Sequence, residues 1–204
     1  MKPLVLVTPN TGIIPDIKEA DYAAVDAGLL KLISDGRNPV FACGDFDSLP
    51  PETLHKFLPE SCRVLEFPAE KNESDSELAI REGKRLGYGP VILTGAFSGR
   101  IDHALANIRL LGFTWPDLIL TDDGQRMQVL EPGVHEVPGD FDHISLFALE
   151  PSCISLEDMK YPLDHRNVTP ADIFTLSNEV APGSRKGIIT VHEGRMLLVE
   201  SDLP

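Results

Sequence analysis

Apolar residues in the first 120 positions follow two patterns that alternate along the chain. Short apolar runs, which are typical of buried strands, occur at 3–8, 22–26, 39–43, 62–67, 91–95 and 117–121. Longer stretches with helical spacing occur at 27–36, 50–58, 74–89 and 101–113. In the last of these, the predicted buried face consists of Ile101, Leu105, Ile108 and Leu111. Strands separated by helices predict a parallel sheet with helices on its faces.

The pattern changes near residue 125, where helical spacing fades. Short apolar runs between turn residues follow at 134–139, 143–150, 153–158, 173–178, 187–194 and 195–201. This spacing is typical of an antiparallel sandwich or barrel. The sequence therefore predicts an α/β domain at 1–124, followed by an all-β, sandwich- or barrel-like domain at 125–204.

Bulk composition narrows the class of protein. Of 204 residues, 42% are hydrophobic and 25% are charged, as in ordinary globular proteins. The formal charge of −14 argues against a nucleic-acid partner, because a phosphate backbone is bound by basic faces. No apolar run is long enough to cross a membrane, and we expect a cytoplasmic protein. Cys43, Cys62 and Cys153 lie far apart and suggest neither a disulfide framework nor a zinc site.

Two acidic clusters follow predicted strands. In GDFDSLP (44–50), Asp45 and Asp47 are either turn residues or oxygen ligands for a magnesium ion that carries phosphate. In EKNESDSE (70–77), Ser74 and Glu77 have the spacing of a helix capping box, and Asp75 suits the first helical turn. Asp75 is also placed to join Asp45 and Asp47 around one metal ion.

A third cluster, TGAFSGRIDH (94–103), links a strand to a helix. Gly95 and Gly99 flank a short loop at a helix N-terminus, where main-chain N–H groups hold anions, and Arg100 would add a phosphate donor. The plainer interpretation makes Asp102 a first-turn acid and His103 a surface residue.

Asp26 repeats the arrangement at another strand-to-helix turn, where an N-cap role is the simpler explanation. In a parallel sheet all these positions fall along one edge. Four local features therefore predict one polar crevice.

The motifs taken together resemble thiamine pyrophosphokinases. That family's usual forms are D-G-G, G-D-F-D-S, E-K-D-x-T-D-x-E and G-G-R-x-D-H, and this chain has its versions in the same order. MKYPL (159–163) and LSNE (176–179) resemble the family's C-terminal signatures, so the likeness covers nearly the whole chain. The departures from the usual forms are Ala27, Asn72, Ser74 and Ser98.

The resemblance implies that a pyrophosphoryl group passes from ATP to the hydroxyl of thiamine, giving AMP and thiamine diphosphate, with Mg²⁺ as cofactor. It implies Mg²⁺ ligation by Asp45, Asp47 and Asp75. It implies catalytic roles for Asp47, Asp75, Arg100 and Asp102. It implies ATP contacts from Asp26, Gly95, Gly99, Arg100, Asp102 and His103. It also implies thiamine contacts from Ser177 and Asn178, and a homodimer with active sites between subunits. The resemblance does not decide which residue is the general base, and the candidates are Asp26, Asp47, Asp75 and Asp102.

Three alternatives remain at this point. One is a diphosphokinase of the same fold that acts on another alcohol, such as a pterin, and another is an ATP-binding protein without turnover. The third is a haloacid-dehalogenase-like phosphatase. That class has a D-x-D motif, which Asp45 and Asp47 could imitate, and a later acidic pair, which TDDG (121–124) could imitate. Gly44 before the pair and Ser48 after it argue against that class.

Overall fold

The computed structural model describes residues 1–46, 58, 62–68 and 70–202. The chain divides into two compact units, Met1–Asp123 and Gly124–Pro204. The helix predicted at 50–58 lies outside the described residues except for its last position. Asp47 also lies outside them. Among the residues that the structure describes, no helix is long and apolar enough to span a membrane.

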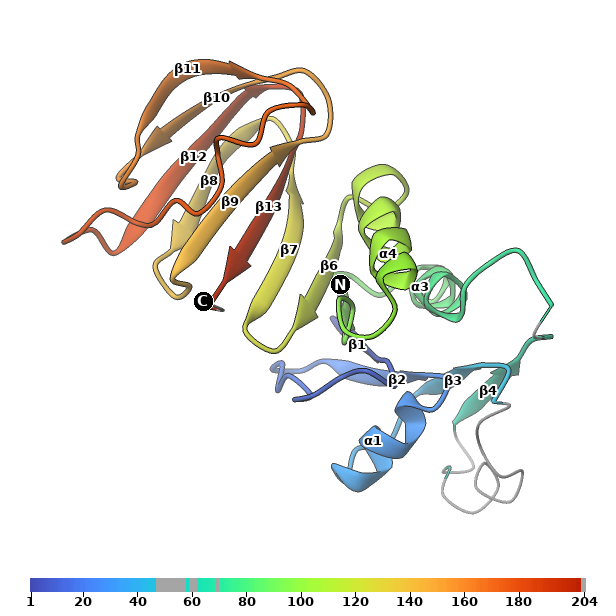
Figure 1. Cartoon of the computed structure of the whole chain (residues 1–204). Coiled ribbons are helices and arrows are strands. Elements are labelled where there is room, and N and C mark those ends of the chain that lie inside the picture. The colour runs from blue at the N-terminus through green and yellow to red at the C-terminus, as the bar shows by residue number, and fades with distance from the viewer. Residues whose placement is uncertain (47–57, 59–61, 69, 203–204) are drawn as a thin grey trace. The chain divides into compact units, whose positions relative to one another are not determined.

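The first unit is built on a parallel sheet, as the alternating pattern predicted (Figure 1). Its strands lie in the order β4-β3-β2-β1-β5-β6. Their bounds are β1 Leu4–Val7, β2 Asp21–Val25, β3 Phe41–Gly44, β4 Arg63–Glu66, β5 Val91–Thr94 and β6 Leu118–Asp122. Every residue of β1, β3 and β5 is buried, which explains why these strands read as continuous apolar runs.

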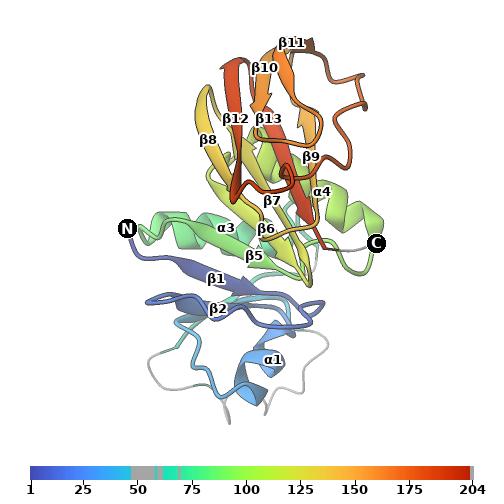
Figure 2. The ribbon, with the colours of Figure 1, turned by 90° about the vertical axis from the view of Figure 1, so that its left-hand side faces the viewer.

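Helices cover both faces of this sheet. Helix α1 (Gly28–Ser34) lies on one face, and α3 (Asp75–Arg85) and α4 (Ile101–Phe113) lie on the other (Figures 1 and 2). The predicted start of α3 is confirmed, since the Ser74 hydroxyl accepts the Glu77 N–H at 3.1 Å. The Glu77 carboxylate turns instead to Arg81, at 2.7 Å.

Strand order places a topological switch point at β1. The chain moves outward from β1 through β2 and β3 to β4, and then returns to β5 on the other side of β1. Connections on either side of such a point leave in opposite directions, so a crevice opens at the carboxyl ends of the two strands. The first unit therefore has a built-in place for a ligand between the ends of β1 and β5.

The second unit is an antiparallel β-sandwich, as predicted. One sheet has the order β7-β13-β9, and the other has the order β11-β10-β12-β8. The bounds are β7 Gln125–Leu130, β8 Gly133–Pro138, β9 His143–Ala148, β10 Ser152–Glu157, β11 Leu163–Val168, β12 Lys186–Glu193 and β13 Met196–Ser201. Ile144 and Leu198 from one sheet and Ile154 and Ile189 from the other belong to one buried core.

A buried ion pair links two strands of the first of these sheets. The Glu200 side chain on β13 is fully buried, and its carboxylate receives two hydrogen bonds from the Arg126 guanidinium on β7, at 2.6 and 2.8 Å. Arg126 also lies over the Phe141 ring, 5.1 Å from its centroid. The bond to Glu200 raises the pKa of Arg126, so this pair is a fixed charged element inside the sandwich.

Two predictions about the elements are wrong, and two strands were not predicted. Segment 173–178 is not a strand, because Ser177 adopts a φ of +54° and only isolated bonds join the segment to β9. The predicted buried face of α4 is right at Leu111 but wrong at Ile101 and Leu105, which are exposed, while Ala104 and Asn107 are buried in their place. Strands β7 and β11 were not predicted, since polar residues interrupt both.

Candidate active site

A cleft of about 370 Å³ lies at the carboxyl edge of the first unit's sheet. Loops after β1, β2 and β5 form it together with the N-terminal ends of α3 and α4. Most of the predicted site residues of this unit line it: Asp26, Asp75, Gly95, Gly99, Arg100 and His103. Side chains from positions about 75 residues apart in the sequence therefore meet in one place, as the parallel topology predicted.

The loop after β1 lies directly against the loop after β5, which runs from Gly95 to Gly99. The Thr8 hydroxyl donates to the Gly95 carbonyl at 3.2 Å, and the Asn10 amide donates to the Ser98 carbonyl at 3.0 Å. Gly95 has a φ of +71°, and a Cβ there would lie 2.3 Å from the Thr8 hydroxyl oxygen. Only glycine fits such a position without strain.

The other side of the same loop is held by α4 and β6. The buried Asn107 amide on α4 donates to the Ala96 carbonyl at 3.0 Å. On β6, the Asp122 carboxylate accepts the Ser98 N–H at 2.9 Å. Thr8, Asn10 and Asn107 were not identified from the sequence, and Asp122 was considered there only as part of TDDG (121–124), in the phosphatase alternative. The polar run TPNTG (8–12), at the end of the first strand, was the one signal that could have pointed to the first two.

Arg100 and Asp102 form an ion pair at the start of α4. The guanidinium donates to the two carboxylate oxygens at 3.1 and 2.5 Å, and both side chains are exposed. Asp102 also accepts the N–H of His103 at 3.0 Å. The bond from Arg100 is the main cause of the lowered pKa of Asp102. Asp102 is thus an ionised first-turn acid that orients Arg100 at the rim of the cleft.

The acidic side of the cleft is assembled around the end of β3. The Asp26 N–H donates to the Cys43 carbonyl at 2.8 Å, and the Cys43 sulfur lies 4.0 Å from the Asp75 carbonyl oxygen. The Asp75 carboxylate pairs with Lys71 at 2.9 Å. The N-cap interpretation of Asp26 is wrong. Ala27 holds the N-cap position of α1, and Asp26 has a φ of +48°, a conformation that aspartate tolerates better than most residues.

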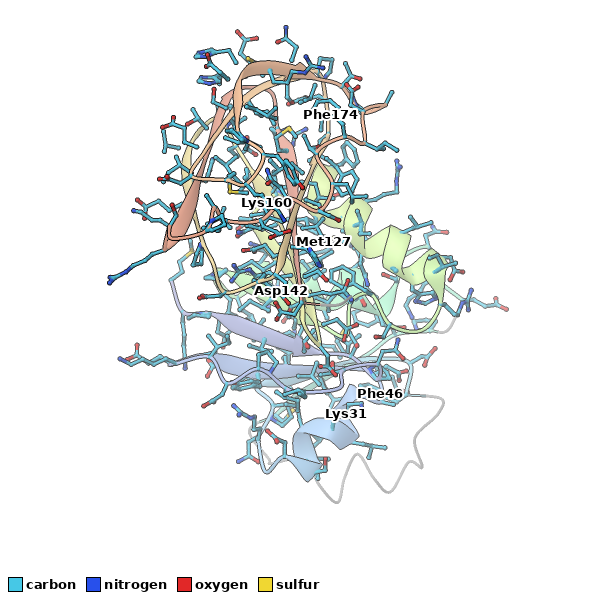
Figure 3. The ribbon with its side chains drawn as sticks, turned by 60° about the vertical axis from the view of Figure 1, so that its left-hand side comes forward. Lys31, Phe46, Met127, Asp142, Lys160 and Phe174 are labelled. Carbon is cyan, nitrogen blue, oxygen red and sulfur yellow. The ribbon has the colours of Figure 1, made fainter. Side chains whose placement is uncertain are left out.

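Asp45 follows β3 by one residue, beside the Cys43 and Gly44 end of the strand. Its neighbour Phe46, labelled in Figure 3, is buried and belongs to the same core cluster as Leu29 and Leu32 of α1. Phe46 has a φ of +52°, which is rare for a bulky residue. Within the described ranges, which omit Asp47, no three acidic, histidine or cysteine side chains gather closely enough to hold a metal.

In the second unit, segments 159–163 and 176–179 lie side by side. Met159 and Val180 form a β-bridge, and the Lys160 N–H donates to the Glu179 carbonyl at 2.8 Å. The buried Asn178 amide donates to the Tyr161 carbonyl and accepts the Tyr161 N–H, both at 3.0 Å. Asn178 therefore fixes the two segments together, and the neighbouring Ser177 is exposed.

Comparison with known proteins gives matches in both units. The family model for the thiamin pyrophosphokinase catalytic domain matches residues 17–116, and the model for the thiamin pyrophosphokinase vitamin B1 binding domain matches residues 134–196. The chain belongs to the thiamine pyrophosphokinase family. One model matches within each unit, which agrees with an α/β part followed by a β-sandwich.

Individual members of the thiamine pyrophosphokinase family match over nearly the full length. The thiamine pyrophosphokinase of Bacillus subtilis (strain 168) is 27% identical over 201 residues, covering 93% of each chain. The crystal structure of the Bacillus subtilis thiamine pyrophosphokinase has a TM-score of 0.86 at 26% identity, covering 99% of this chain and 100% of that one. A thiamin pyrophosphokinase family protein from Enterococcus faecalis has a TM-score of 0.85 at 27% identity, covering 100% of both chains.

Two departures from the usual thiamine pyrophosphokinase motifs have a structural account. Ala27 has a φ of −63°, so the glycine of D-G-G is not needed for its backbone. Ser98 replaces the first glycine of G-G-R, and its hydroxyl donates to Asp122 at 2.6 Å. The structure offers no explanation for Asn72.

We expect the Cys43 thiol, which lies under the acidic side of this thiamine pyrophosphokinase cleft, to be unreactive in the folded protein. Burial, with a smaller contribution from the charge of Asp75, raises its pKa to about 12. In a variant that retains Cys43 as its only cysteine, a chromogenic disulfide reagent should react slowly at neutral pH and rapidly in concentrated urea.

The raised pKa of Cys43 also makes the stability of the protein depend on pH. The unfolded chain ionises Cys43 near its ordinary pKa of 9.0, before the folded chain does. Its contribution to the free energy of unfolding is therefore complete below that pH and is lost as pH rises to about 12. Rapid labelling of Cys43 in the native protein at neutral pH would contradict the burial argument.

Proposed function

We propose that this protein is an ATP-dependent diphosphotransferase that transfers the pyrophosphoryl group of ATP to the hydroxyl of thiamine, giving thiamine diphosphate and AMP. The observation that carries the proposal is the cleft at the switch point of the first unit. There, the motifs shared with thiamine pyrophosphokinases converge from separate β–α connections. Membership of the family, over both units, supplies the substrate class.

The phosphate chain of ATP belongs, on this proposal, at the basic side of the cleft. The N-cap residue of α4, Arg100, makes no side-chain cap bond, and the positive end of the helix dipole lies there, so this helix end attracts phosphate oxygens. Arg100 lies at that helix end with its guanidinium exposed, and it can bind a phosphate oxygen while Asp102 holds it in place. His103, in the first turn of the helix, lines the same cleft.

A divalent cation, which we propose to be Mg²⁺, suits the acidic side of the cleft. The fit rests on the chemistry of the donor set. Asp26 and Asp75 line the cleft and offer the hard carboxylate oxygens that Mg²⁺ prefers. Asp45 and Asp47 would complete the set, with Asp47 outside the described residues. When bound, the metal would offset charge on the phosphate chain as the leaving group separates.

The side chains around this cleft then orient the reactants. Asp75 is held at the first turn of α3 by the Ser74 cap and by Lys71. Asp26 is held by the bond from its N–H to β3. Fixed carboxylates on one side and fixed N–H donors on the other would align the β-phosphorus of ATP between them, and this alignment is the main contribution a protein makes to phosphoryl transfer.

For thiamine, we propose a contact from Ser177, with Asn178 holding its loop. The Asn178 amide already bonds to Tyr161 on both of its polar atoms, so its role is to fix segment 176–179. Beside it, a cavity of about 220 Å³ is lined mainly by apolar side chains, including Leu163 and Phe174. An apolar cavity beside a polar side chain suits the rings of thiamine.

A homodimer with active sites between subunits is part of the proposal. Several large apolar side chains are exposed in each unit and could be covered by a second copy: Ile101, Leu105 and Phe113 in the first, and Tyr161, Ile173, Phe174 and Leu176 in the second. Light scattering at micromolar concentration should give the mass of a dimer. A monomeric mass under conditions of full activity would contradict a shared site.

The reaction is tested by incubating the purified protein with ATP, Mg²⁺ and thiamine and identifying the products by chromatography. We expect AMP and thiamine diphosphate in equal amounts, and neither product after chelation of the metal. Release of ADP, or AMP formation only with another alcohol such as a pterin, would refute the proposed acceptor chemistry. ATP binding without either product would instead indicate a nucleotide-binding protein.

A further inference from the structure

The acidic turn TDDG (121–124) has no part in the function described so far. Asp122 is the last residue of β6, and its half-buried carboxylate reaches the loop from Gly95 to Gly99. One oxygen, Oδ2, accepts the N–H groups of Phe97 and Ser98, at 3.4 and 2.9 Å, and the Ser98 hydroxyl, at 2.6 Å. The other oxygen accepts the N–H of Asp123 at 3.0 Å.

These bonds determine which donors of the loop can meet a ligand. A carboxylate is a strong acceptor for main-chain N–H groups, and a phosphate oxygen would compete for the same donors. Because Asp122 takes the N–H groups of Phe97 and Ser98, a ligand is directed toward the N–H groups of Gly99 and Arg100 at the start of α4. The anion-binding end of the loop is thereby separated from the end that is tied to β6.

Several other main-chain groups of the loop are also hydrogen-bonded. The Ala96 N–H donates to the Thr121 carbonyl at 3.2 Å, and the Ala96 carbonyl accepts from Asn107. The Gly95 and Ser98 carbonyls accept from Thr8 and Asn10. Among these partners, Asp122 alone is charged. Its side chain accepts N–H groups of the loop, whereas the side chains of Thr8, Asn10 and Asn107 donate to carbonyl groups.

We propose that Asp122 is a positioning residue for phosphate binding, which sets the loop from Gly95 to Gly99 so that Gly99 and Arg100 face the phosphate chain of ATP. This inference rests on the proposed function. Asp122 touches no substrate in it and acts only through the loop. Ser98, which stands where the family usually has glycine, adds a third bond and strengthens the same attachment.

The test is steady-state kinetics on Asp122→Ala, with KM measured separately for ATP and thiamine. Releasing the loop should raise the KM for ATP about 10- to 100-fold, since small misplacements of binding groups cost this much. The KM for thiamine should stay within about 2-fold, because this acceptor does not use the loop. Asp122→Asn keeps an acceptor oxygen for the two N–H groups and should recover most of the ATP affinity.

Asp123→Asn is the matched control. Asp123 is the adjacent acid of the same turn, and its carboxylate accepts the Ile13 N–H at 2.9 Å without touching the loop. Its KM for ATP should remain near the wild-type value. If Asp122→Ala does not fold, the KM for ATP is measured in Asp122→Glu instead. The longer side chain keeps the charge but displaces the loop, so the KM for ATP should still rise.

Distinct outcomes separate the two proposals. Wild-type protein that makes no thiamine diphosphate refutes the proposed function. If the wild-type protein is active, an unchanged KM for ATP in folded Asp122→Ala refutes only the positioning role. If Asp122→Ala does not fold, an unchanged KM for ATP in Asp122→Glu refutes it in the same way. Equal rises in both KM values would show a general structural defect and also refute it. Failure of Asp122→Asn to recover ATP affinity would point to a need for the negative charge itself, against positioning.

Discussion

Replacing Asp75 with asparagine should lower the rate of thiamine diphosphate formation by about 10²- to 10³-fold, the usual effect of removing one preorganised electrostatic group from such a site. Asp75 lines the cleft, and the Ser74 cap and the ion pair with Lys71 fix its position. Asparagine has nearly the same shape but cannot bind a divalent cation as tightly. The loss should appear mainly in kcat at saturating ATP and thiamine.

Glu77→Gln is the matched control for Asp75→Asn. Glu77 lies in the same first turn of α3, pairs with Arg81 at 2.7 Å and is not part of the cleft. Both substitutions remove a charge that complements the helix dipole, worth about 0.3–1 kcal/mol, so their melting temperatures should fall by similar amounts. Near-normal turnover in Asp75→Asn, or equal losses of turnover in both variants, would argue against a role for Asp75 in the reaction.

The largest effect on stability is expected at the second unit's buried ion pair. Arg126→Met leaves the fully buried Glu200 carboxylate without its two hydrogen bonds. Breaking one side of a buried pair typically costs about 3–5 kcal/mol, because the remaining charge stays out of water. Urea unfolding monitored by circular dichroism should therefore show a large fall in the free energy of unfolding.

A surface pair in the same sandwich provides the comparison. Lys186 and Glu136 also form an ion pair across two strands, but both side chains are about half exposed. Lys186→Met should change the free energy of unfolding by less than about 1 kcal/mol, as is usual for exposed pairs. Similar small changes in both variants would mean that Glu200 is readily rehydrated or neutralised when Arg126 is lost.

The sequence predicted the elements whose signals are local. The helix at 101–113 begins and ends as predicted, and the buried strands of the first unit stand out because parallel strands covered on both faces are apolar throughout. The sequence did not predict which face of a helix is buried, because the tertiary environment determines this. Ile101 and Leu105 look like core residues of α4, yet they are exposed, because the sheet takes the face with Ala104 and Asn107.

The candidate site was predictable to the extent that its residues follow strand ends. Asp26, Asp75 and Arg100 each lie after a strand and at or just before the start of a helix, and the parallel topology brings them together. Thr8 and Asn10 could not be found in this way, because their partners lie 87 and 88 residues further along the chain. Their role exists only in the folded sheet, where β1 and β5 are neighbours.

The way in which the loop from Gly95 to Gly99 is attached has a consequence for evolution. Its partners bond to main-chain atoms at Gly95, Ala96, Phe97 and Ser98, so most side chains on the loop are not needed to keep its path. Apart from Gly95 and Gly99, whose positive φ angles favour glycine, residues of the loop can therefore be substituted without losing its shape. The serine at position 98, where the family's usual motif has glycine, is one substitution of this kind, and its main-chain N–H and carbonyl keep their bonds to Asp122 and Asn10.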